Sequence, residues 1–135
     1  QLWQLFVGVD VRKATQPDLF HRLSRNAREL PDDGPIVEKS SGEEVGEKSS
    51  NEQALYQIEL DIGRTFPGLC DDFVFRRALR EVLYAYAAFN PTVGYTQSMN
   101  FLAGMLLVFM EPHGAFWLLD YIVSHLMPFT FHDNL

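Results

Sequence analysis

The most regular stretch of the sequence is residues 71–89, DDFVFRRALREVLYAYAAF. Its apolar residues recur at helical spacing, as Phe75, Leu79, Val82, Tyr86 and Phe89. Its arginines fall mostly on the opposite side, as Arg76, Arg77 and Arg80. Asp71 and Asp72 suit a helix start, and Asn90 before Pro91 ends it, because a residue preceding proline disfavours helical backbone. The stretch predicts an amphipathic helix of about five turns.

Helical patterns continue toward the C-terminus. Residues 96–110 predict a helix that is apolar on all sides from Phe101 onward, which indicates burial within a larger helical body. Pro112 begins a further helix that Pro128 stops. Its expected buried face consists of Phe116, Leu119, Ile122, Val123 and Leu126. The most apolar helix needs more partners than the chain provides, so we expect the helices that complete the domain to be absent.

Toward the N-terminus the same reasoning predicts more helices. Asn51 caps one that reaches Ile62, with Leu55, Ile58 and Ile62 on one face. Another runs from about residue 17 to 30, and an apolar stretch at 2–7 is stopped by Gly8. Because this stretch opens abruptly, we expect a trimmed start. No segment alternates with period two, so the predicted class is all-α.

The acidic residues are concentrated in one segment. The chain has a net charge of −7, and residues 29–52 contain eight acidic and two basic residues, a net charge of −6. Within it, residues 38–50 contain no aromatic residue and a single aliphatic one, Val45, which predicts a flexible insert at about residues 31–50. A spacer is the simpler role, and regulation through its serines is the alternative. The rest of the chain is close to neutral, which argues against nucleic-acid binding.

Other functional classes are excluded by composition. Cys70 is the only cysteine, so the chain has no internal disulfide, which suits a reducing intracellular setting. The four histidines lack ligand-like spacing, so we expect no metal site. The longest apolar run, residues 101–110, is about half the length that crosses a bilayer, so we expect no transmembrane segment.

Residues 58–67, IELDIGRTFP, predict an arginine just past a helix end. Asp61 lies one helical turn before Arg64, where it is placed to hold the guanidinium. A braced, exposed arginine suits phosphate or transition-state recognition. The alternative is an ordinary Asp–Arg pair at a helix C-terminus.

Residues 94–100, GYTQSMN, predict a glutamine in the first turn of a helix, after a glycine that permits a sharp entry. A side-chain amide there can position a water molecule. The alternative is helix capping by Thr96 or Ser98. Asn100 is expected to hydrogen-bond a neighbouring loop backbone.

Together, I-x-x-D-x-x-R-T-F-P and Y-x-Q-x-M-N resemble the TBC domain of Rab GTPase-activating proteins, with Arg64 and Gln97 33 residues apart. The stretch around Trp3, the segment 116–119 and the pair 127–128 also resemble motifs of that family. The resemblance covers residues 1–135 except the acidic insert. It implies the N-terminal part of a multi-helical TBC domain that lacks its C-terminal helices.

The resemblance implies two catalytic fingers supplied to a GTP-bound Rab. Arg64 matches the arginine finger and Gln97 the glutamine finger that orients the attacking water. The supporting positions are Asp61, Thr65, Tyr95 and Asn100. The chain would be a GTPase activator rather than an enzyme, with no cofactor of its own, because GTP and Mg²⁺ belong to the partner.

The resemblance further implies a role in vesicle trafficking and a cytoplasmic location, with peripheral endomembrane association through flanking regions as an option. One departure is Ser98, where the family usually has glycine. We expect serine to preserve the finger geometry. The alternative function is a helical module that binds a Rab or another trafficking partner with little or no catalysis. A coincidental match in an unrelated helical domain is the third reading.

Overall fold

The computed structural model describes residues 2–30 and 50–127. Within these ranges every regular element is a helix, which confirms the predicted all-α class. The elements are α1 (Leu2–Thr15), α2 (Leu19–Leu23), α3 (Arg25–Arg28), α4 (Ser50–Ile62), α5 (Phe73–Phe89), α6 (Met99–Phe109), α7 (Pro112–Tyr121) and the π-helical η1 (Ile122–Leu126). The expected acidic insert at 31–50 lies outside the described residues except for Ser50.

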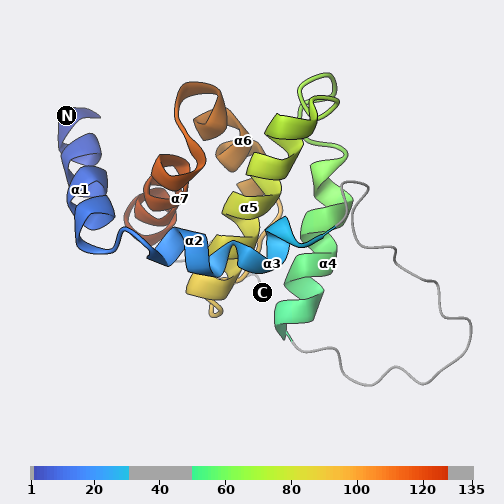
Figure 1. Cartoon of the computed structure of the whole chain (residues 1–135), viewed down its shortest axis with the longest axis horizontal. Helices are drawn as coiled ribbons and strands as arrows, with labels where there is room; N and C mark the ends of the chain where they lie inside the picture. The colour runs from blue at the N-terminus through green and yellow to red at the C-terminus, as the bar shows by residue number, and fades with distance from the viewer. Residues whose placement is uncertain (1, 31–49, 128–135) are drawn as a thin grey trace, which may run out of the picture.

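Helix α5 is the centre of the fold. It packs against α2, α3, α4, α6 and α7, while α1 packs on the far side of α7 (Figure 1). Its start is fixed by Asp72, whose Oδ1 accepts hydrogen bonds from the main-chain N–H groups of Val74 and Phe75 at 2.7 and 3.3 Å. The predicted position of this helix is therefore confirmed, with Asp72 as the N-cap.

The burial of α5 is wider than its predicted stripe. Leu79, Val82 and Tyr86 are buried as expected, whereas Phe89 is partly exposed. The assignment of Arg80 to the polar side is wrong, because its side chain is almost fully buried. A helix that packs against five others buries residues on more of its surface than one apolar stripe, so Arg80 is buried although it lies outside that stripe.

Two N-terminal boundaries differ from the predictions. The expected single helix at 17–30 is divided into α2 and α3 at Ser24, whose backbone has φ −85° and ψ 0°. A ψ near zero interrupts the helical ladder there. In α1 the helix continues through Gly8 to Thr15, because glycine weakens a helix without necessarily stopping it.

Helix α6 begins at Met99, three residues later than predicted, so Gln97 precedes the helix. Only part of α6 is buried among the described residues: Met99, Asn100, Ala103 and Gly104. Its exposed apolar side chains are Phe101, Met105, Val108 and Phe109. No helix in the described part of the chain has the length and apolar character needed to span a membrane.

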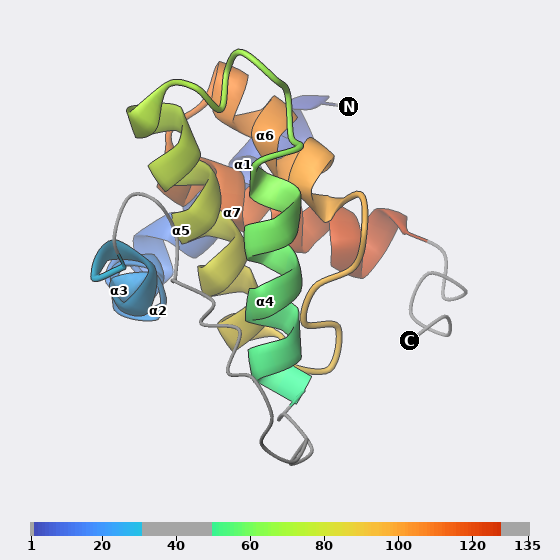
Figure 2. The same ribbon diagram turned by 90° about the vertical axis from the view of Figure 1, so that its right-hand side faces the viewer.

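The arrangement brings two distant turns together. Figure 2 shows α4 in front, with the chain leaving α5 passing beside it to reach the start of α6. Helices α4 and α6 are in contact. The turn after α4 carries Arg64, and the turn before α6 carries Gln97.

Candidate functional site

Arg64 lies in a tight turn directly after α4. Its main-chain N–H donates to the Asp61 carbonyl oxygen at 3.0 Å, and the N–H of Thr65 donates to the Ile62 carbonyl oxygen at 3.1 Å. The Arg64 side chain is exposed. Its guanidinium has no ion-pair or hydrogen-bond partner among residues 2–30 and 50–127. The turn therefore fixes the Arg64 backbone and leaves its guanidinium on the surface.

Thr65 ties the turn of Arg64 to helix α6. Its side chain is fully buried, and its Oγ1 donates to the Asp61 carbonyl oxygen at 2.7 Å. The same Oγ1 accepts a hydrogen bond from Asn100 Nδ2 at 2.8 Å. Asn100 is hydrogen-bonded as we expected, but its partner is this side-chain hydroxyl and not a loop backbone. A buried hydroxyl with both bonds satisfied gives the turn one preferred position.

Phe66 adds an apolar contact between the same two segments. Its ring meets Phe101 edge-on, with the ring centroids 5.7 Å apart. A Cβ atom built on Gly104 of α6 would lie only 2.8 Å from Phe66 Cε2, so this glycine permits the close approach. The Phe66 backbone has φ 46°, a strained value for a non-glycine residue. The fold therefore holds this turn in a conformation that the local sequence would not adopt alone.

Asp61 and Tyr95 form the second polar connection. The Tyr95 hydroxyl donates to Asp61 Oδ2 at 2.7 Å, and Gln57 Nε2 donates to Asp61 Oδ1 at 3.2 Å. Burial, followed by the hydrogen bond to Asp61, raises the pKa of Tyr95 well above its usual range. The carboxylate thus binds Tyr95 and Gln57 instead of the expected Arg64 guanidinium. Asp61 supports Arg64 through its carbonyl oxygen.

Gln97 lies in an exposed turn between two residues with positive φ. Gly94 has φ 60° and Ser98 has φ 90°. The N–H of Met99 closes the turn on the Thr96 carbonyl oxygen at 3.1 Å. The Ser98 side chain makes no capping hydrogen bond, so the serine carries the backbone strain without compensation at the helix start.

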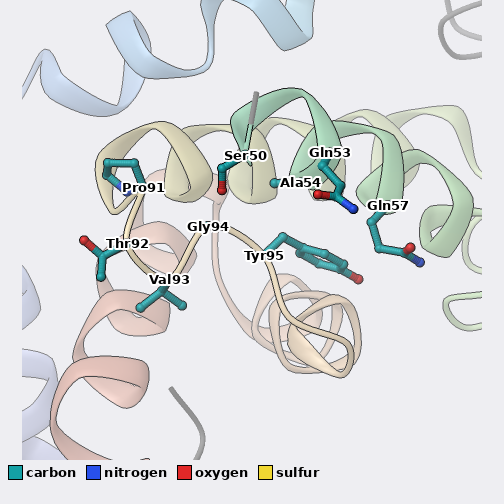
Figure 3. Close-up of a pocket in the computed structure, with 9 residues that line it drawn as sticks. All are labelled: Ser50, Gln53, Ala54, Gln57, Pro91, Thr92, Val93, Gly94 and Tyr95. Carbon is teal, nitrogen blue, oxygen red and sulfur yellow. The ribbon is translucent and has the colours of Figure 1, made fainter. Parts of the chain in front are cut away.

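A cleft of about 400 Å³ separates α4 from the segment that leads to Gln97. Figure 3 shows Gln53 and Gln57 projecting from α4 on the side of the Tyr95 ring. Its lining residues are Ser50, Gln53, Ala54, Gln57, Pro91, Thr92, Val93, Gly94 and Tyr95. None of these side chains is charged, and neither Arg64 nor Gln97 is among them. The cleft is therefore a neutral polar gap beside the site.

The sequence patterns do not predict a buried polar cluster between α4 and α5. Arg80 Nε and Nη2 donate to the two carboxylate oxygens of Glu59 at 2.8 and 3.1 Å, and the Tyr84 hydroxyl donates to Glu59 Oε1 at 2.8 Å. The signal was present: Arg80 and Tyr84 are four residues apart and share a helix face. The helical pattern alone does not reveal which neighbouring helix covers that face.

The structure brings together the four predicted supporting residues, Asp61, Thr65, Tyr95 and Asn100. It places the side chains of Arg64 and Gln97 on the surface. Groups of three or more metal-ligating side chains are not found among the described residues. The site therefore consists of two exposed polar side chains on two turns that are joined beneath them.

The family model of the Rab-GTPase-TBC domain matches residues 1–135, and the chain belongs to this family. It is 42% identical over 95 residues to GTPase-activating protein GYP3 of Saccharomyces cerevisiae, which covers 62% of this chain and 14% of that protein. It is 41% identical over 145 residues to GTPase-activating protein MSB4 of the same yeast, which covers 98% of this chain and 25% of that protein.

A human relative, TBC1 domain family member 2A, is 45% identical over 86 residues, which covers 60% of this chain and 9% of that protein. The chain therefore spans at most 25% of the length of these three relatives. No solved structure matches it. The family resemblance predicted from the two motifs is confirmed by these matches.

Proposed function

We propose that this chain is part of a GTPase-activating domain that supplies Arg64 and Gln97 to a GTP-bound Rab-family GTPase. The main support is geometric: both side chains are exposed, and buried hydrogen bonds join the turns that carry them. Family membership and relatives named as GTPase-activating proteins support the same function. The alternatives for the two motifs, an ordinary Asp–Arg pair and helix capping by Thr96 or Ser98, do not account for this connection.

Arg64 would act on the charge that develops during phosphoryl transfer. A planar guanidinium delivered to the β- and γ-phosphates stabilises the transition state, and such an arginine finger contributes about 10³–10⁵ in rate. This corresponds to roughly 4–7 kcal/mol of the barrier. An arginine without a competing carboxylate among the described residues suits transfer into a partner's active site.

Gln97 would orient the attacking water through its side-chain amide. Its position before α6, on a turn held by Tyr95 and Asn100, keeps the amide outside the helix. Asp61 and Thr65 hold the other turn, so the four supporting residues would keep both fingers in one arrangement. Preorganisation of this kind lowers the barrier because no reorganisation is needed at the moment of reaction.

The chain would then be an activator and not itself the enzyme. GTP and Mg²⁺ would be contributed by the Rab, and the chain would need no cofactor of its own. We place this activity in the cytoplasm, at or near endomembranes and in vesicle trafficking, with any membrane contact made by regions that flank the domain. Co-localisation of the intact protein with endomembrane markers tests the placement.

The second candidate is a binding module that docks a Rab without catalysis. The observation that favours it is Ser98, which adopts φ 90° directly after Gln97. If the strained turn relaxes in the complex, Gln97 would lose its position while binding persists. A GTPase activator should bind its Rab more tightly with a γ-phosphate transition-state mimic, whereas a scaffold should bind equally well without it.

The deciding experiment measures stimulated GTP hydrolysis by a panel of GTP-loaded Rabs with the intact protein. We expect Arg64→Ala to reduce stimulation by about 10³-fold or more, and Gln97→Ala to reduce it strongly as well, because the attacking water loses the amide that orients it. The matched controls Arg25→Ala and Gln53→Ala, which change exposed side chains outside both turns, should retain it. Stimulation that survives both finger substitutions contradicts the proposal.

A further inference from the structure

Glu59, Arg80 and Tyr84 form a buried polar cluster between α4 and α5. The Glu59 carboxylate accepts two hydrogen bonds from the Arg80 guanidinium and one from the Tyr84 hydroxyl, at 2.8–3.1 Å. The side chains of Arg80 and Glu59 are only 3% and 9% exposed. A two-point arginine–carboxylate pair is directional, so it defines the orientation of both helices.

The ion pair in this cluster is expected to add little to the free energy of unfolding. The desolvation of two charges offsets most of their attraction, and well-packed apolar side chains of similar volume are often as stabilising. The two-point geometry would instead favour one placement of α4 on α5, because a rotation or axial shift of α4 moves Glu59 away from one or both nitrogen atoms of Arg80.

The registration of α4 bears directly on Arg64. Glu59 and Asp61 are two residues apart in the last turns of α4, so their side chains leave the helix in different directions. Glu59 is held by α5, and Asp61 is held by Tyr95. The end of α4 is thus fixed from two sides. Arg64 follows through a turn whose hydrogen bonds begin at Asp61 and Ile62, so a shift of α4 would move Arg64 with it.

We infer that Glu59, Arg80 and Tyr84 are positioning residues that set where Arg64 enters the partner's active site, an inference that rests on the proposed function. They do not touch the nucleotide. They fix the helix that carries the finger, while the Asp61–Tyr95 bond fixes that helix to the turn of Gln97. Loss of the cluster leaves the finger present but displaced.

The test replaces the ion pair with apolar side chains, as Glu59→Met together with Arg80→Met, in the intact protein. We expect the folded state to persist, since both charges of the ion pair are removed together. The maximal stimulated hydrolysis rate should fall by about 10²-fold, because a displacement of about 1 Å costs that much, while the KM for the GTP-loaded Rab changes little. Arg77→Met is the control, because the ion pair that it breaks, with Glu81, lies within α5 and is not part of the cluster.

A second readout does not depend on GTPase activation. Hydrogen exchange at the amides of Arg64 and Thr65, which are bonded to Asp61 and Ile62, should quicken in the double variant, while the amides of α7 stay unchanged. If the wild-type protein does not stimulate any Rab, or Arg64→Ala has no effect, the proposed function fails, and this exchange measurement still decides the positioning.

Tyr84→Phe covers the case in which the double variant does not fold. It removes one hydrogen bond to Glu59 and leaves the ion pair, so the fold should persist. We expect a several-fold lower maximal rate at an unchanged KM. A wild-type maximal rate in the folded double variant overturns the inference, as does a loss confined to KM or unchanged exchange at Arg64 and Thr65. If only Tyr84→Phe folds, its wild-type rate overturns the inference.

Discussion

The Tyr95 hydroxyl donates a 2.7 Å hydrogen bond to Asp61 Oδ2, across 34 residues of sequence. Each residue stands three or fewer positions from an exposed polar side chain, Asp61 before Arg64 and Tyr95 before Gln97. The bond therefore joins the two turns of the proposed site at their base. A second hydrogen bond, from Asn100 to Thr65, joins the two segments again, four residues after Asp61 and five residues after Tyr95.

Removing this bond tests how strongly it holds the turns. Tyr95→Phe leaves the buried Asp61 carboxylate with one fewer donor, and we expect a loss of about 1–3 kcal/mol in the free energy of unfolding. Urea denaturation of the variant and wild-type protein measures it. Tyr121→Phe is the comparison, because the Tyr121 hydroxyl has no hydrogen-bond partner within residues 2–30 and 50–127. Equal stability of Tyr95→Phe and the wild type would show that the bond contributes nothing net.

Ser98 predicts a stabilising substitution. Its φ of 90° is unfavourable for a side chain with a Cβ, so Ser98→Gly should raise the free energy of unfolding by about 1 kcal/mol. Gly94→Ala is the opposing control, because it places a Cβ on a residue with φ 60° and should destabilise the fold. Thermal unfolding of the two variants should shift in opposite directions. A lower melting temperature for Ser98→Gly would refute the strain argument.

Gly104 predicts a steric effect on the Arg64 turn. In Gly104→Ala the new methyl group would meet the Phe66 ring at 2.8 Å, so the ring and its turn must move. We expect about 1–3 kcal/mol of destabilisation and a reduced rate of stimulated hydrolysis. Gly63→Ala is the matched control, since nothing lies within 4 Å of its added Cβ. Similar effects from both alanines would contradict the contact as the cause.

The exchange of arginine for lysine tests the chemistry of the finger. Arg64→Lys keeps the positive charge on an exposed residue but loses the planar guanidinium. We expect most of the roughly 10³–10⁵-fold contribution to be lost, with stability unchanged. The maximal stimulated rate and the melting temperature are the two measurements. A lysine variant with wild-type rate would mean that Arg64 acts only as a point charge.

His113 predicts a pH dependence at the junction of α2 and α7. Trp117 Nε1 donates to His113 Nε2 at 3.1 Å, which requires a neutral imidazole. Burial is the main cause that lowers the pKa of His113 from its ordinary 6.5. The positive charge of Lys13 and the nearby His21 lower it further, and Glu111 opposes them. A lowered histidine pKa contributes stability above pH 6.5 that is lost as the pH falls through the folded-state value.

The measurement is the free energy of unfolding between pH 7.5 and about pH 5. The wild-type protein should lose more stability on acidification than His113→Gln, whose side chain cannot accept a proton in this range. His125→Gln, on an exposed histidine, is the control and should follow the wild type. Identical pH profiles for wild type and His113→Gln would contradict the assignment.

Much of the fold follows from local patterns. The periodicity of residues 71–89, with Asp72 before it and Asn90 after it, is enough to place α5, because capping and proline effects act within one turn. The order and spacing of the Arg64 and Gln97 motifs are enough to indicate the family that the comparisons confirm. Ser24 and Met99 show the limit, since helix breaks and starts depend on contacts outside the local window.

By itself, the sequence determines the helical class, the family and the order and spacing of the two motifs, because these depend on composition, spacing and local backbone preference. Only the tertiary structure decides what those residues contact. It directs the Asp61 carboxylate to Tyr95 and buries Arg80 against Glu59. Such partners lie 21–34 residues apart in the chain. Their pairing is decided by how α4, α5 and α6 pack, since no local pattern specifies which helix faces which.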